Sequence, residues 1–127
     1  RPGLESVLGT EVRRADRYGA PLLLTVLEVD PPAGSGALRP ELMHAFTRSL
    51  RARLRDLDYL AELSPGRIAI LSPHTDRQGG RVVIRARAVL ADLASEFPAV
   101  NGLGLRSNQV QYPGDAASFA ELLTRLG

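Results

Sequence analysis

The fold of this chain is decided by residues 60–76, which read LAELSPGRIAILSPHTD. Two short apolar segments, residues 59–63 and 67–71, flank the turn residues 64–66 (SPG). Proline and glycine favour tight turns, and apolar segments of this length joined by such a turn predict a β-hairpin. The strands of a hairpin are antiparallel, so the sheet that contains them is expected to be antiparallel at least in part.

Upstream of the hairpin, the sequence predicts a helix, a strand and a second helix. Apolar residues recur at helical spacing over residues 4–18, and Gly19 is expected to end this helix. Residues 21–30 (PLLLTVLEVD) are apolar and bounded by breakers, which is typical of a buried central strand. Residues 31–40 (PPAGSGALRP) predict a loop, and residues 41–57 predict an amphipathic helix with arginines on its polar side.

Downstream of the hairpin, residues 78–97 predict a helix and residues 102–112 predict a strand. The last helix is expected to begin at Asp115, with the carboxylate as its N-cap. This order of elements predicts an α+β domain, in which helices flank a central, mostly antiparallel sheet.

Length and composition limit the possible functions. The 127 residues are expected to form one domain, residues 1–127, and the start at Arg1 rather than Met suggests a piece excised from a longer multidomain protein. Cysteine is absent and all 16 basic residues are arginine, which excludes disulfides, thiolate chemistry and Schiff-base lysines. His44 and His74 lie far apart and are expected at the surface rather than in a metal site. The net charge of +2 is too small to indicate nucleic-acid binding, and no apolar run is long enough to span a membrane.

Four segments of the sequence, in order and with sensible spacing, resemble the landmarks of a GGDEF domain, the domain of diguanylate cyclases. They are EVRRADRYGAPLLLTVLEVD (residues 11–30), the hairpin (residues 60–76), RVVIRARAVL (residues 81–90) and LGLRSNQVQYPGDAASFAELL (residues 103–123). The resemblance covers almost the whole chain. It implies a nucleotide-cyclase-like fold with a ferredoxin-like core.

The resemblance also implies that this domain is degenerate at the hairpin turn. In the family, the turn sequence GGDEF places glycine backbone against GTP and a carboxylate on magnesium. Here residues 64–68 read SPGRI, so Ser64 and Gly66 flank Pro65, whose ring removes a backbone N–H where the nucleotide would approach. Arg67 replaces the metal-binding acid, and its positive charge would repel magnesium at close range.

The other family positions at the active site are altered as well. Glu28 corresponds to the metal-binding aspartate, Asp30 matches the second acid, and residues 31–44 (PPAGSGALRPELMH) lack the residues that hold guanine and phosphate. We therefore expect no cyclase activity, no metal and no cofactor. Three states remain open for the two acids: an ion pair with Arg67, a metal site, or solvated side chains. In the first state, replacing Arg67 by alanine would destabilise the fold modestly.

One family site does have counterparts in this sequence. GGDEF proteins often carry an allosteric site for cyclic di-GMP, an R-x-x-D motif just upstream of the hairpin turn, and Arg55 and Asp58 stand at that spacing. An arginine can bond guanine O6 and N7 together, and an aspartate can accept hydrogen bonds from the N1 and N2 edge. Aligning the helix after the hairpin makes Arg85, with Arg87 next, the expected third member. The alternative is an arginine at a helix end that pairs locally with an acid.

The expected function is that of a catalytically inactive receptor for cyclic di-GMP, with ligand-binding residues Arg55, Asp58, Arg85 and Arg87. The ligand would bridge this surface to another domain of the same chain, a protein partner or a second copy in a homodimer. The alternative is an interaction or scaffold domain that kept the fold and ignores nucleotides, and a third possibility is GTP binding without turnover. We expect a cytoplasmic protein with no nucleic-acid partner and no membrane contact by this domain.

Overall fold

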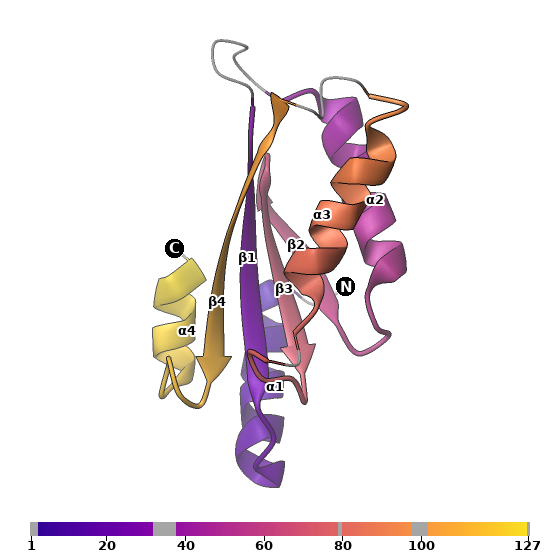
Figure 1. Ribbon diagram of the computed structural model, residues 1–127. Coiled ribbons are helices and arrows are strands. Elements are labelled where there is room, and N and C mark those ends of the chain that lie inside the picture. Colours follow the sequence, from indigo (N-terminus) through magenta and orange to yellow (C-terminus); the bar gives the residue numbers. More distant parts are fainter. Residues whose placement is uncertain (1–2, 32–37, 79, 98–101, 127) are drawn as a thin grey trace.

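The computed structural model describes residues 3–31, 38–78, 80–97 and 102–126 of the chain. Helices flank one sheet on both of its faces (Figure 1). In chain order the elements are α1 (Leu4–Tyr18), β1 (Leu22–Asp30), α2 (Pro40–Arg53), β2 (Tyr59–Ser64), β3 (Arg67–Pro73), α3 (Val82–Leu93), β4 (Gly104–Tyr112) and α4 (Phe119–Leu126). Within the described ranges, no helix is both long enough and apolar enough to cross a bilayer.

The four strands form one sheet in the order β2-β3-β1-β4, and every neighbouring pair is antiparallel. β1 lies between β3 and β4, so both of its edges are hydrogen-bonded, and its residues from Leu22 to Leu27 are buried. The sequence predictions of a hairpin, a buried central strand and an α+β architecture are therefore confirmed.

Each face of the sheet carries its own apolar core. Helices α2 and α3 cover one face, and α1 and α4 cover the other (Figure 1). Alternate residues of β1 serve the two cores: Leu24 and Val26 pack toward α1 and α4, whereas Leu27 and Val29 pack toward α2 and α3. This division follows from the two-residue period of a strand, which points successive side chains to opposite faces.

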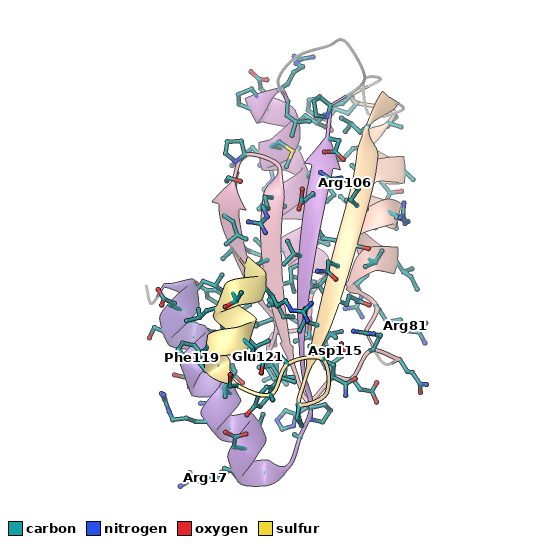
Figure 2. The ribbon with its side chains drawn as sticks, turned by 90° about the vertical axis from the view of Figure 1, so that its left-hand side faces the viewer. Arg17, Arg81, Arg106, Asp115, Phe119 and Glu121 are labelled. Atoms are coloured by element: carbon teal, nitrogen blue, oxygen red, sulfur yellow. The ribbon has the colours of Figure 1, made fainter. Side chains whose placement is uncertain are left out.

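Helices α1 and α4 cover only one end of their face of the sheet. Figure 2 shows these two helices over the lower part of the sheet and Arg106 of β4 well above them. Beyond the helices, this face carries charged side chains in place of an apolar core, among them Glu28, Asp30 and Arg67.

Two helix starts differ from the sequence prediction. α4 begins at Phe119 because Ser118, not Asp115, accepts the early N–H groups: its Oγ bonds the N–H of Glu121 at 3.2 Å. The Asp115 carboxylate instead accepts the N–H of Gln111 at 3.0 Å and forms an ion pair with Arg77. α3 begins at Val82, four residues later than predicted, because the preceding residues form a turn.

Two further boundaries were also misplaced. α2 ends at Arg53 rather than at residue 57, because Asp58 Oδ2 accepts the backbone N–H of Arg55 at 3.0 Å and holds a separate turn. α3 ends at Leu93 rather than residue 97. The predicted loop at residues 31–40 lies mostly outside the described residues.

The hairpin turn depends on a glycine. Gly66 is buried and has φ +83, in the region that residues with a Cβ rarely adopt. Its carbonyl accepts the N–H of Val29 at 2.8 Å, which holds the turn against β1. A Cβ at this position would lie 2.9 Å from the carbonyl oxygen of Val29 and 2.6 Å from Cδ1 of Leu38.

Replacing Gly66 by alanine is expected to lower the free energy of unfolding by about 3 kcal/mol, because left-handed strain adds to overpacking against backbone. Gly19→Ala is the matched control. Gly19 also has a positive φ, +65, but its Cβ would meet nothing within 4 Å, so only the strain of about 1 kcal/mol remains. Urea denaturation of both variants measures the difference, and equal losses would contradict the role given to the close approach.

Candidate functional site

The first candidate site is the exposed end of the sheet at the hairpin turn. Antiparallel pairing sets Glu28 of β1 directly between Arg67 of β3 and Arg106 of β4. Paired residues on neighbouring strands share a face, so the carboxylate is flanked by two guanidinium groups. Asp30 follows two residues later on the same face of β1.

Arg106 is the principal partner of both acids. Its Nε lies 2.7 Å from Oδ2 of Asp30 and its Nη2 lies 3.0 Å from Oδ1, a bidentate arrangement. The same Nη2 donates to Oε2 of Glu28 at 2.8 Å. These hydrogen bonds hold the pKa of the Asp30 carboxyl below its usual range and raise the pKa of the Arg106 guanidinium.

The predicted ion pair between Arg67 and Glu28 is also present, with 3.7 Å between Nε of Arg67 and Oε1 of Glu28. It is the longer of the two contacts that Glu28 makes with a guanidinium group. Arg106 was not predicted as a member of this site from the sequence. Alternation along residues 102–112 puts Arg106 on the same face as Tyr112, but only the register of β4 on β1 shows that it faces Glu28.

These residues do not fit a divalent cation. A metal ion bound by Glu28 and Asp30 would lie beside two guanidinium groups and would have to displace Arg106 from three carboxylate oxygens. Among the residues that the structure describes, no cluster of three acidic, histidine or cysteine side chains could hold a metal ion. Of the turn residues, Ser64 and Pro65 are exposed and Gly66 is buried against Val29.

The second candidate site surrounds Arg55 and Asp58, in the turn between α2 and β2. The Asp58 side chain is 1% exposed, and its Oδ1 accepts hydrogen bonds from Nη2 and Nε of Arg55 at 2.8 and 3.2 Å. Arg55 Nη2 also donates to the carbonyl oxygen of Pro73 at 3.0 Å and to Oγ1 of Thr75 at 2.7 Å. Arg55 therefore ties the α2–β2 turn to the end of β3, while 40% of its side chain remains exposed.

A cavity of about 40 Å³ opens beside this pair of residues. It brings together two of the predicted members of the site, Arg55 and Asp58, with the third, Arg85. The full lining is Arg55, Asp58, Ser72, Thr75, Gly80, Arg81, Val82 and Arg85. Arg87 does not line it and is exposed elsewhere on α3.

The cavity is positively charged. Three arginines and one aspartate line it, and within the described part of the chain neither Arg81 nor Arg85 forms an ion pair with an acid. Arg55 and Asp58 also border a second, more open hollow of about 360 Å³, which adds Arg51 and Asp56. Figure 2 places Arg81 near the end of the sheet that α1 and α4 cover, far from Arg106.

Three further polar side chains of the cavity were not predicted as members of the site from the sequence: Ser72, Thr75 and Arg81. The segment RVVIRARAVL was recognised, but Arg81 was placed inside a longer helix, whereas it is the residue just before α3. Ser72 and Thr75 carried no signal of their own in the sequence, because their role depends on the approach of Arg55 and the start of α3.

The sequence matches no family model and no curated protein. By structure, the chain is similar to a DGC protein from Thermotoga maritima, with a TM-score of 0.73, 14% identity, and coverage of 95% of this chain and 86% of that one. It is similar to the diguanylate cyclase SiaD from Pseudomonas aeruginosa, solved in complex with its activator SiaC, with a TM-score of 0.76, 20% identity, and coverage of 97% and 50%.

A third similar structure is the GGDEF domain of DgcB from Caulobacter crescentus in complex with cyclic di-GMP, with a TM-score of 0.71, 12% identity, and coverage of 96% and 74%. At these identities the likeness concerns the fold. The chain therefore has the fold of GGDEF domains, as the sequence resemblance implied.

Replacing Arg106 by glutamine is expected to raise the pKa of Asp30 toward its ordinary value of 3.8, because the bidentate contact that lowers it is lost. Since the folded-state pKa is depressed, the contact stabilises the fold above pH 3.8 and this contribution is lost as the pH falls through the folded-state value. A carbon-detected NMR titration of the carboxyl group measures the pKa. Arg67→Gln is the control, because within the described residues the ion pair of Arg67 is with Glu28 and not with Asp30. An equal effect of both variants would contradict the assignment.

Proposed function

We propose that this GGDEF-fold domain is a catalytically inactive receptor for cyclic di-GMP, which binds at Arg55, Asp58 and Arg85. One observation carries the proposal: these three residues, chosen from different segments of the sequence, line the same positively charged cavity. The ligand carries two guanines and two phosphodiester groups, so it needs both planar hydrogen-bonding partners and positive charge. The cavity offers both.

Each member has a definite role in the proposal. Arg55 bonds O6 and N7 of a guanine, and Asp58 accepts hydrogen bonds from its N1 and N2 edge. The two side chains now bond each other, so binding exchanges that contact for contacts with the base; the exposed Arg55 is the side chain that moves. Arg85 rather than Arg87 completes the site, because only Arg85 lines the cavity.

The structural comparison supports this ligand class. The GGDEF domain of DgcB shares the fold and was solved with cyclic di-GMP bound. In our proposal the bound ligand bridges this surface to another domain of the same chain, to a protein partner or to a second copy, in the cytoplasm.

Loss of catalysis follows, in this proposal, from the charges at the hairpin turn. Arg67 stands where the family places a metal-binding acid, and Arg106 engages both remaining acids. Pro65 adds a ring and removes a donor at the turn. Magnesium would therefore meet guanidinium groups in place of a metal site, and the triphosphate would lack the metal ion that its reaction requires.

A second candidate function is ligand-independent protein interaction. Two observations favour it. The Asp58 carboxylate already accepts a hydrogen bond from Arg55. The large apolar residues Ile84 and Leu57 are 60% and 59% exposed. The similar protein SiaD was solved in complex with a protein activator. Affinity capture with and without cyclic di-GMP separates the two functions, because only the receptor should change its partner with the ligand.

Isothermal titration of the purified domain with cyclic di-GMP is expected to show binding. Arg85→Ala is expected to weaken it about 10- to 100-fold, because a hydrogen bond from a charged group contributes about 1.5–3 kcal/mol. Arg85 forms no ion pair in the described structure, so its loss should leave the fold intact. Arg87→Ala, on the same helix but outside the cavity, is the control.

Arg55→Ala should abolish the same binding, although it also removes the arginine that pairs with the buried Asp58 carboxylate and lowers stability. Its folded fraction is therefore measured first by circular dichroism. No heat at millimolar ligand, or unchanged affinity in both the Arg55 and Arg85 variants, would rule the receptor function out.

Purified protein incubated with GTP and magnesium is expected to form no cyclic di-GMP, because guanidinium groups occupy the surroundings of both acids. Chromatography of the nucleotides detects the product, with an active diguanylate cyclase assayed in parallel. Formation of the cyclic dinucleotide by this domain would contradict its assignment as inactive.

A further inference from the structure

The N-terminus of α3 forms one wall of the cavity beside Arg55. α3 has 12 residues and follows Arg81, which stands at the N-cap with φ −118 and ψ 8. No side chain caps this end, and its first turn contains no acid. The first N–H groups of a helix have no partner inside the helix and carry partial positive charge, so this end can accept an anion.

Ser72, which lines the same cavity, carries a buried hydroxyl. Ser72 of β3 is 2% exposed, and among the described residues its Oγ has no hydrogen-bond partner. Buried polar groups in native proteins are nearly always hydrogen-bonded, so an unpaired hydroxyl that lines a cavity indicates a missing partner inside it. Thr75, the other hydroxyl of the lining, is already satisfied by Pro73 and Arg55.

The wall that carries these donors is held in place. Gly80 packs so closely on β1 that a Cβ there would lie 2.6 Å from Cδ2 of Leu23. Its N–H donates to the carbonyl oxygen of Asp76 at 3.1 Å, and the helix starts two residues later. Gly80 therefore lies against Leu23, the residue of β1 that is paired with Ser72 of β3.

The size and charge of the cavity restrict what fits. A cavity must have a volume of about 10–15 Å³ to hold one water molecule. The cavity beside Arg55 has a volume of about 40 Å³, so it admits a group of several atoms. Three guanidinium groups exclude a cation, and the only acid of the lining, Asp58, already accepts hydrogen bonds from Arg55. A tetrahedral oxyanion presents acceptor oxygens in several directions, which matches donors from a hydroxyl, a helix end and an arginine.

We infer that this cavity binds a phosphate-class oxyanion, held by the Ser72 hydroxyl, the first N–H groups of α3 and the Arg81 guanidinium. In a bound cyclic dinucleotide the oxyanion is a phosphodiester group, and to that extent the inference rests on the proposed function. Inorganic phosphate shares the same chemistry and tests the site independently.

The experiment measures two ligands on five proteins. Titration with cyclic di-GMP is followed by calorimetry, and titration with inorganic phosphate is followed by the amide NMR signals of residues 82–84. The proteins are the wild type, Ser72→Ala, Arg81→Gln and two controls. Thr47→Val removes the other buried hydroxyl that lacks a partner among the described residues, and Arg87→Gln removes an arginine of α3; neither residue lines the cavity.

We expect Ser72→Ala and Arg81→Gln each to weaken binding about tenfold, because each removes a hydrogen bond to a charged group. Neither control should change either affinity. Without ligand, Ser72→Ala should melt no earlier than the wild type, since it removes an unpaired buried hydroxyl; this separates a binding role from a structural one.

The outcomes distinguish this inference from the proposed function. One outcome is that phosphate shifts the signals of residues 82–84, more weakly in Ser72→Ala and Arg81→Gln than in the wild type and the controls, while cyclic di-GMP does not bind. In that case the oxyanion site stands and the receptor function fails. If the dinucleotide binds through Arg55 and Arg85, but Ser72→Ala and Arg81→Gln bind both ligands as the wild type does, the receptor function stands and the oxyanion site is refuted. If neither cyclic di-GMP nor phosphate binds, the receptor function and the oxyanion site are both refuted.

Discussion

The antiparallel pairing of β1 with β3 fixes both candidate sites, because its register runs from Leu22 opposite Pro73 to Glu28 opposite Arg67. At one end of this ladder, Glu28 lies between guanidinium groups of two neighbouring strands. At the other end, the chain leaves β3 beside Pro21, whose carbonyl accepts the N–H of Thr75 at 3.1 Å, and then turns toward α3. A change of register by one residue would move every one of these side chains to the opposite face.

The two ends of the sheet use arginine in different ways. At the hairpin end, Arg106 and Arg67 neutralise two acids, so the charges are balanced locally. At the opposite end, Arg55 binds Asp58, but Arg81 and Arg85 have no acidic partner within the described chain. Among the described residues, the second end therefore retains unpaired positive charge, whereas the charges at the hairpin end are paired.

Local features of the sequence were sufficient for much of the fold. The helix at residues 4–18 and the hairpin were predicted correctly because helical periodicity, Gly19 and the SPG turn act within a few residues of chain. Asp115 was wrongly placed as a helix cap because its carboxylate binds Arg77, 38 residues away. That contact exists only in the folded chain.

The sites were predictable to a similar extent. Arg55 and Asp58 came from the spacing of a family motif, and Arg85 and Arg87 came from aligning the helix after the hairpin by its apolar face. Arg55, Asp58 and Arg85 line one cavity, whereas Arg87 does not. Arg106 was missed because strand register is set by long-range pairing, and Ser72 because an unpaired hydroxyl can be recognised only once its surroundings are known. Periodicity assigns a residue to a face of an element but does not say which other segment will cover it.

The contacts of Arg77 bear on the thermodynamics of any ligand that enters the cavity. The Arg77 guanidinium binds the Asp115 carboxylate and the carbonyl oxygen of Gln109. The backbone N–H of Arg77 donates to Oε1 of Gln111 at 3.1 Å. Arg77, which lies between β3 and α3, is thereby anchored to β4 and to the turn that follows it. Such preorganisation removes most of the conformational entropy that a loose loop would lose on binding, so more of the interaction energy remains as affinity.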